Sequence, residues 1–170
     1  MSELDAFIAT WDHEAQNSAK LLRALPAGQY DFRPDPGGRS LGELAWHLAE
    51  IAGVMSFGIA EGKFTMGVKR PSLERPRAIA ELAPGYDRVH REAVTRLRAV
   101  DLPDLGRTIT FFNGRDMPIR MILWAATLHH EIHHRGQLTL MCRLAGGVPP
   151  SMYGPGREDM ARMMAERAKG

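Results

Sequence analysis

The sequence lacks several features that define whole classes of protein. Its 170 residues include one cysteine, Cys142, so no disulfide can form within the chain, which fits a reducing compartment. No stretch reaches the roughly 18 apolar residues that a membrane span requires, and the first residues show neither the basic start nor the apolar run of a secretory signal. We therefore expect a cytoplasmic protein without a membrane partner, with Cys142 in its core.

An excess of charge of one sign is also missing. The 22 basic and 20 acidic residues give a formal net charge of +2, and both signs are scattered along the chain. A nucleic-acid-binding protein usually carries a basic stripe or arm, so we expect no nucleic-acid partner. The content of 44% hydrophobic and 25% charged residues is ordinary for a globular protein, and the length suits one domain over residues 1–170.

Turn signals divide the sequence into long segments with helical periodicity. Apolar residues recur every three or four positions from residue 4 to residue 25, where a proline follows. Ser40 and Glu43 form a capping box, in which each side chain can bind a free backbone amide of the other residue, so a second helix is expected to begin there. A third helix is predicted from Pro84, a good first-turn residue, to about residue 100, and a short turn over residues 77–82 either precedes it or is absent. A fourth, the longest, is predicted to run without interruption from residue 117 to residue 144.

Shorter elements connect and follow these helices. Glycines and prolines between residues 61 and 76 mark a long crossover connection, and Asn113-Gly114 predicts a short β-hairpin near residues 108–117. A short C-terminal helix carrying Met160, Met163 and Met164 is expected to cap the bundle. The predicted fold class is all-α, a four-helix bundle, and such bundles build metal and cofactor sites from inward-facing side chains.

Four of the seven histidines fall within residues 129–134, in the longest predicted helix. Residues four apart lie on one face of a helix, so either His129 with His133 or His130 with His134 can present two imidazoles to one ion. The helical wheel does not choose between these pairs. A buried imidazole without a partner costs about 1 to 3 kcal/mol, whereas a shared cation turns that cost into binding energy. The cluster therefore predicts a divalent metal site.

Residues 130–134 also match H-E-x-x-H, the motif of zinc proteases in which the glutamate is the general base. No histidine follows His134 to supply a third ligand, so we do not expect a protease. Two interpretations of Glu131 stay open. It is either a solvated residue on the outer face of the helix or a group that transfers protons close to the metal.

Several motifs together resemble the DinB-like family, which includes the YfiT-like metalloenzymes, over most of the chain. They are residues 30–34, residues 39–44 with His47, residues 130–138, Pro149-Pro150 and residues 153–155. The resemblance implies a four-helix bundle, commonly a homodimer, with a divalent metal held by one histidine of the second helix and two of an H-x-x-x-H on the last long helix. Those positions are His47, His130 and His134 here. Gln137, one turn further, could then bind a metal-bound water or support a ligand.

Three imidazoles leave open positions on an ion, which is typical of a catalytic site. Characterised members of the resembled family include bacillithiol transferases and a mycothiol-dependent maleylpyruvate isomerase. We therefore expect a metal-dependent enzyme for a small-molecule substrate, either a low-molecular-weight-thiol S-transferase or a hydrolase, with Glu131 and Gln137 as candidate catalytic residues. Zn or Ni is the preferred ion, and Fe, Mn and Cu are alternatives. The competing hypothesis is a non-catalytic, metal-stabilised bundle that acts as a binding or stress-response interaction protein.

Two further groups of residues are candidates for the site. Asp12 and His13 of the first helix are either a source of a fourth ligand or solvent-facing residues. Arg33, Arg39 and Tyr153 lie in loops, where they either bind an anionic group of the substrate at the mouth of the site or are solvated.

Overall fold

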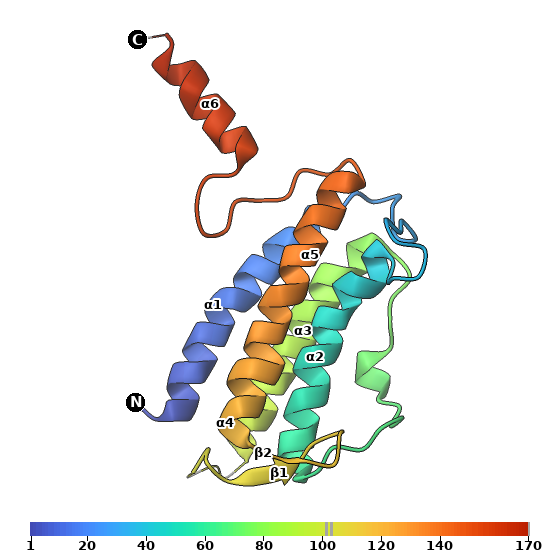
Figure 1. Ribbon diagram of the computed structural model, residues 1–170, viewed down its shortest axis with the longest axis vertical. Helices are drawn as coiled ribbons and strands as arrows, with labels where there is room; N and C mark the ends of the chain where they lie inside the picture. The colour runs from blue at the N-terminus through green and yellow to red at the C-terminus, as the bar shows by residue number, and fades with distance from the viewer. Residues whose placement is uncertain (101, 103, 170) are drawn as a thin grey trace.

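Four long helices form a bundle in the computed structural model, which describes residues 1–100, 102 and 104–169 (Figure 1). They are α1 (Glu3–Arg23), α2 (Leu41–Glu61), α3 (Ile79–Ala99) and α5 (His130–Leu144). α2 packs mainly against α3 and α5, and α1 packs mainly against α3. The predicted four-helix bundle is confirmed, and residues 62–78, with the 3-10 turn η1 (Pro71–Leu73), form its long crossover connection.

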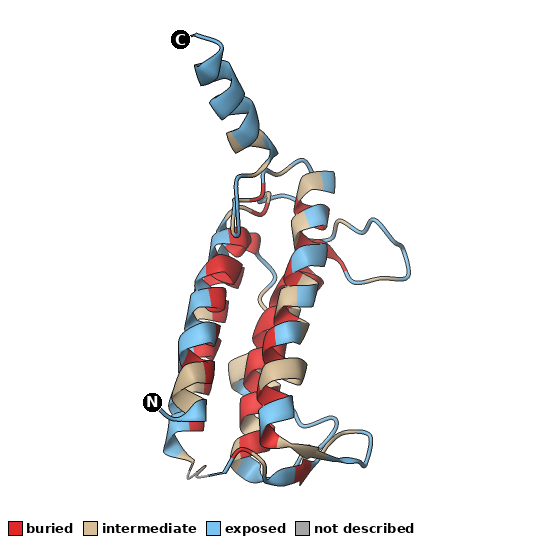
Figure 2. Cartoon of the chain, turned by 60° about the vertical axis from the view of Figure 1, so that its left-hand side comes forward, coloured by how far each residue is buried: buried red, intermediate tan, exposed pale blue. Residues whose placement is uncertain are grey.

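Buried residues line the inner faces of these helices, as Figure 2 shows. The start of α2 is fixed by the predicted capping box: Ser40 Oγ accepts the Glu43 N–H at 3.2 Å, and the Glu43 carboxylate accepts the Ser40 N–H at 2.8 Å. This cap sets the rotation of α2, which presents His47 about two turns later.

α3 begins at Ile79, so the predicted start at Pro84 is wrong, and most of the short turn considered over residues 77–82 is part of the same helix. Pro84 lies inside the helix, where it removes one backbone hydrogen bond to the preceding turn. Ile79, Leu82 and Ala83 are buried in that first part of the helix, and the apolar surface they remove from water offsets the loss. Tertiary packing therefore outweighs the local preference of the proline.

The predicted hairpin is confirmed. It consists of β1 (Thr108–Thr110) and β2 (Asp116–Pro118), paired antiparallel with Ile109 opposite Met117. Gly114 has a φ of 75° in the turn, a left-handed conformation that favours glycine. The hairpin lies at the end of the bundle where α2 ends and α4 begins (Figure 1).

The fourth helical run is not uniform, contrary to the prediction. It starts with α4 (Ile119–Met121), continues as a π-helical segment, η2 (Ile122–His129), and becomes regular only in α5. The His130 N–H donates to the carbonyl of Ala125, five residues earlier. Extended π-helical segments are rare and often occur at functional sites, and this one ends directly before a predicted metal ligand.

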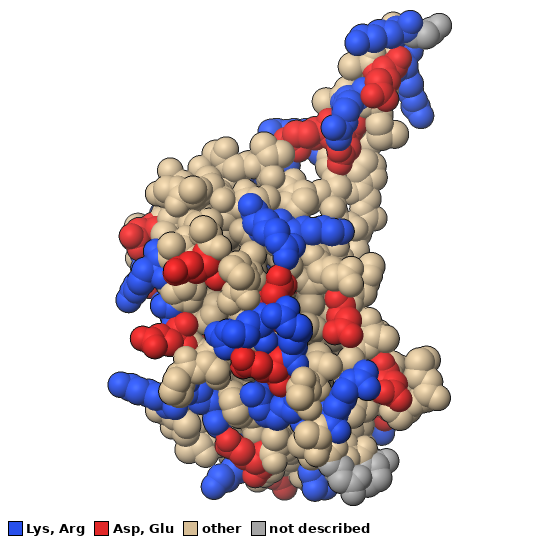
Figure 3. Space-filling view, turned by 180° about the vertical axis from the view of Figure 1, so that it is seen from behind, with Lys and Arg blue, Asp and Glu red and all other residues tan. Residues whose placement is uncertain are grey.

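The C-terminal helix α6 (Arg157–Arg167) exists as predicted, but it does not cap the bundle. It extends away from the other helices (Figure 1), and none of its residues is buried. Figure 3 shows basic and acidic side chains mixed over the back of the bundle and on this helix. Among the described residues, no helix has the length and apolar character to cross a membrane.

Candidate metal centre

Three histidines from two helices converge between α2 and α5. One ring nitrogen from each of His47, His130 and His134 lies within 4.8 Å of the others, and all three residues are half-buried. The ring centroid of His47 lies 5.6 Å from that of His130 and 4.8 Å from that of His134. The structure thus brings together the three residues that the family resemblance selected, which we call the histidine triad.

Each ring of the triad has a hydrogen-bond partner on the side facing away from the other two rings. Glu50 Oε2 lies 3.0 Å from His47 Nδ1, and Gln137 Oε1 lies 2.7 Å from His134 Nδ1. The backbone of Ala126 binds the His130 ring. A neutral ring that donates one N–H to such a partner keeps a lone pair on its second nitrogen, so these contacts fix the tautomers that suit metal ligation.

The contact between His130 and His134 shows why a cation fits here. Their Nε2 atoms lie 2.8 Å apart, and both other nitrogens are engaged elsewhere, so two lone pairs face each other when both rings are neutral. A shared cation removes this repulsion. Tetrahedral ligation with Zn–N bonds of 2.0–2.1 Å separates two nitrogens by about 3.3 Å, so the rings need only a small movement to accept an ion.

Burial also prepares two of these rings for metal binding. It lowers the pKa of His134 from 6.5 to about 4, and the Gln137 hydrogen bond only partly opposes that shift. Burial, followed by the proximity of His47, lowers the pKa of His130 as well. Both rings are therefore neutral at pH 7, and an incoming ion does not have to displace a proton from them.

Glu50 belongs to the site although sequence reasoning missed it. Burial alone would raise the pKa of its carboxyl, but hydrogen bonds from His47 and Arg75 outweigh burial and keep the pKa below its usual value. Arg75 Nη2 lies 3.2 Å from Glu50 Oε1. The signal was present in the sequence, because a residue three positions after His47 lies beside it on a helix.

Glu131 is not solvated, so that interpretation is wrong. Its side chain is fully buried, and its carboxylate accepts hydrogen bonds from Trp11 Nε1 at 2.9 Å, Ser18 Oγ at 2.7 Å and the Tyr86 hydroxyl. These donors belong to α1 and α3, whereas the triad lies between α2 and α5. The structure therefore does not bring Glu131 to the triad.

Arg135, the next residue of α5 on the same face, is also buried. Its guanidinium donates to the Glu14 carboxylate, the Glu14 carbonyl at 2.8 Å, Ser18 Oγ at 3.3 Å and the Tyr153 hydroxyl. Ser18 therefore links Arg135 to Glu131. We call these seven residues the buried polar network: Trp11, Glu14, Ser18, Tyr86, Glu131, Arg135 and Tyr153.

The other predicted candidates lie elsewhere or have other partners. Asp12 pairs with His90 at 2.8 Å, and Arg33 pairs with Glu43 at 2.7 Å. His13, His129 and His133 are exposed, and Arg39 is exposed at the start of α2. Cys142 is fully buried, as predicted.

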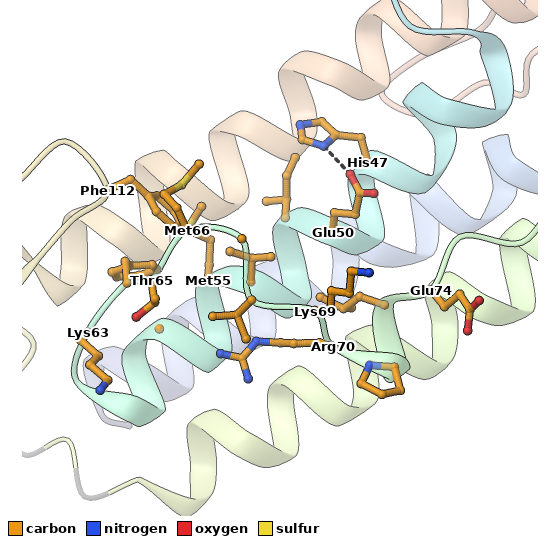
Figure 4. A pocket seen from close by; sticks show the side chains of 18 residues that line it. His47, Glu50, Met55, Lys63, Thr65, Met66, Lys69, Arg70, Glu74 and Phe112 are labelled. Carbon is orange, nitrogen blue, oxygen red and sulfur yellow. Dashed lines mark hydrogen bonds and ion pairs between the residues drawn. The ribbon is translucent and has the colours of Figure 1, made fainter.

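A pocket of about 1010 Å³ lies beside the triad, and His47 and Glu50, but not His130 or His134, line it (Figure 4). α2 forms one side of the pocket, and residues of the crossover connection form the other. A substrate in this pocket would reach one metal ligand directly.

Comparisons with known proteins agree with this architecture. The chain is 27% identical over 166 residues to the uncharacterized protein YrdA of Bacillus subtilis (strain 168), covering 98% of this chain and 97% of that protein. A crystal structure of a DinB-like protein from Bacillus cereus ATCC 10987 superposes with a TM-score of 0.71 at 30% identity, covering 88% of this chain and 97% of that one. The DinB-like protein YjoA of Bacillus subtilis gives a TM-score of 0.69 at 24% identity, covering 87% and 96%. Since the family model for the DinB family also matches residues 1–168, this chain belongs to the DinB family.

Proposed function

We propose that the protein is a metal-dependent enzyme that binds one Zn or Ni ion through His47, His130 and His134 and acts on a small molecule. The observation that supports this most is the convergence of three half-buried imidazoles whose ligand atoms lie within 4.8 Å of one another, a cluster that no fourth ligand group of the described residues joins. Closed structural zinc sites have four protein ligands, whereas catalytic sites keep a position for water or substrate.

The reaction is the transfer of a low-molecular-weight thiol to an electrophile or a hydrolysis. A bound ion would lower the pKa of a coordinated thiol or water, so that a thiolate or hydroxide nucleophile exists at neutral pH. The protein residues position the parts: Glu50, Ala126 and Gln137 orient the three rings, and the pocket beside His47 admits the substrate. A cytoplasmic location, where low-molecular-weight thiols are reduced, belongs to this proposal.

A homodimer is also part of the proposal. α6 has 11 residues and none of them is buried, although Met160, Met163 and Met164 are exposed on it. An isolated helix of this length is marginally stable in water, so a second copy of the chain is the natural cover for it. Light scattering should give the mass of two chains, and a mass of one chain would contradict this part.

The proposal is tested with protein loaded with one equivalent of Zn or Ni. We expect it either to conjugate a member of a panel of low-molecular-weight thiols to 1-chloro-2,4-dinitrobenzene or to hydrolyse p-nitrophenyl acetate. The His47→Ala variant and chelator-treated protein are the controls, and both should lose the activity. A fully loaded protein without turnover in either assay would instead support the non-catalytic, metal-stabilised bundle.

A further inference from the structure

The pocket beside the triad is large enough to select a substrate. Its volume of about 1010 Å³ lies at the upper end of the roughly 300 to 1,000 Å³ of pockets that bind drug-sized molecules. In Figure 4, His47 and Glu50 lie at one end, and Lys63 and Phe112 lie toward the other. A molecule that spans the pocket therefore places one end beside a metal ligand and the other near the crossover connection.

The walls between these ends are apolar. Ile51, Val54 and Met55 line the pocket from α2, and Phe64 lines it from the crossover connection. The Phe64 ring packs against Phe112 with centroids 4.9 Å apart, which holds an aromatic wall in place. Such walls bind hydrocarbon or aromatic groups, because their burial removes apolar surface from water.

The polar groups of the pocket leave positive charge without a partner. Arg70 is neutralised by Glu61 at 2.8 Å. Lys63 and Lys69 line the pocket without an ion pair to any acidic side chain in the described part of the chain. Glu74 lacks a basic partner there as well, and it lies on the Lys69 side of the pocket, at the opposite edge from Lys63 (Figure 4). Lys63 therefore favours an anionic group on a ligand that reaches its end of the pocket.

We propose that the substrate of the triad is an elongated apolar molecule with an anionic group, such as a carboxylate. Its apolar body lies between α2 and the crossover connection, Lys63 binds the anionic group at the end of the pocket away from the triad, and the other end lies beside His47. This inference rests on the proposed function for the identity of the reacting end, but the binding it describes can be measured without turnover.

Titration calorimetry with two probes of equal chain length, decanoate and 1-decanol, tests the proposal. Decanoate should bind the metal-loaded protein more tightly than 1-decanol. The Lys63→Gln variant should weaken decanoate binding by about two- to fivefold and leave 1-decanol unchanged, because one exposed ion pair contributes only a small factor. The matched control is Lys20→Gln on α1, a lysine outside this pocket, which should change neither affinity.

A second variant tests the location. Val54 is only partly buried, so Val54→Trp should fill the pocket without disturbing the core and should weaken both probes more than tenfold, with unchanged metal content. Equal binding of the two probes, or decanoate binding that is unchanged in Lys63→Gln, would overturn the anionic assignment. Unchanged binding in Val54→Trp would overturn the pocket. Metal content measured on the same samples reports separately on the proposed function, since a protein that binds decanoate without holding metal would contradict only that function.

Discussion

α5 carries two pairs of polar side chains at the same four-residue spacing, and the fold uses them in opposite ways. His130 and His134 face α2, are half-buried, and direct two ring nitrogens at each other. Glu131 and Arg135, each one residue further along, face α1 and α3 and are fully buried. One step along α5 turns a side chain by about 100° around the helix axis. This step separates the candidate metal centre from the interior of the bundle.

The two pairs differ in whether their hydrogen-bonding groups are satisfied. Glu131 and Arg135 leave no buried polar atom without a partner among the described residues. A fully satisfied buried network rigidifies a core and specifies one arrangement of its helices. The triad instead has partners only on its outer side, so its inner nitrogens remain available to a ligand. The network therefore holds α5 in place, whereas the triad is arranged so that it could hold a metal ion.

The largest expected effect is on metal affinity. His134→Ala should weaken Zn or Ni binding by more than about 100-fold, because losing a ligand exceeds the 10- to 100-fold cost of losing an outer hydrogen-bond partner. His133→Ala removes an exposed neighbour and should leave one ion per chain, as measured by elemental analysis after dialysis. Full metal content in His134→Ala would show that the other histidine pair holds the ion.

Sequence reasoning predicted the elements that local chemistry determines. The capping box of α2 and the hairpin turn depend on residues close in sequence, and both are present. The family resemblance, not the helical wheel, selected His130 and His134 over their neighbours. The position of α6 and the start of α3 depend on packing between distant segments, so local preference could not predict them.

The sequence pattern predicted only part of the buried polar network. Leu138 and Cys142 lie at the spacing that continues from Glu131 and Arg135, and all four are buried. This stripe could have indicated that Glu131 faces the core. The donors that make its burial tolerable lie 45 to 120 residues away on α1 and α3, so no local pattern names them. The π-helical segment has no glycine or proline to mark it.

The second prediction concerns stability and the ion pair inside the network. Arg135→Met removes the partner of the buried Glu14 carboxylate and should lower the free energy of unfolding by about 3 to 5 kcal/mol. Arg143→Met is the matched control, because Arg143 pairs with Glu158 at the surface and such pairs contribute about 0 to 1 kcal/mol. Urea unfolding of metal-free protein measures both. Equal losses would mean that the buried pair does not stabilise the fold.

Glu131→Gln distinguishes a structural role from a catalytic one. The amide group turns one acceptor into a donor that faces the Trp11, Ser18 and Tyr86 donors, at a cost of about 1 to 3 kcal/mol. We expect lower stability in urea, one bound metal ion, and unchanged turnover at temperatures where the variant is folded. A loss of turnover without a loss of stability would restore the catalytic assignment.

Gln137 is expected to act through His134. Gln137→Ala removes the acceptor at 2.7 Å from His134 Nδ1 and should weaken metal binding by about 10- to 100-fold, because the ring then loses its fixed orientation. Thr139→Ala is a suitable control two residues further along, since Thr139 bonds only the Arg135 carbonyl. Competition with a coloured chelator measures the affinities, and a Gln137→Ala value equal to wild type would exclude this support.

The smallest effect is the response of metal-free stability to pH. The folded pKa of His134 is about 4, below the unfolded value of 6.5, so between these values the unfolded chain binds a proton that the folded chain does not. The contribution of His134 is therefore constant above pH 6.5 and declines as pH falls toward 4. His134→Asn should flatten this part of the curve in urea unfolding at a series of pH values. No equivalent change should follow His133→Asn, because that ring is exposed. If both variants keep the wild-type slope, the decline comes from other groups and the triad does not hold His134 neutral.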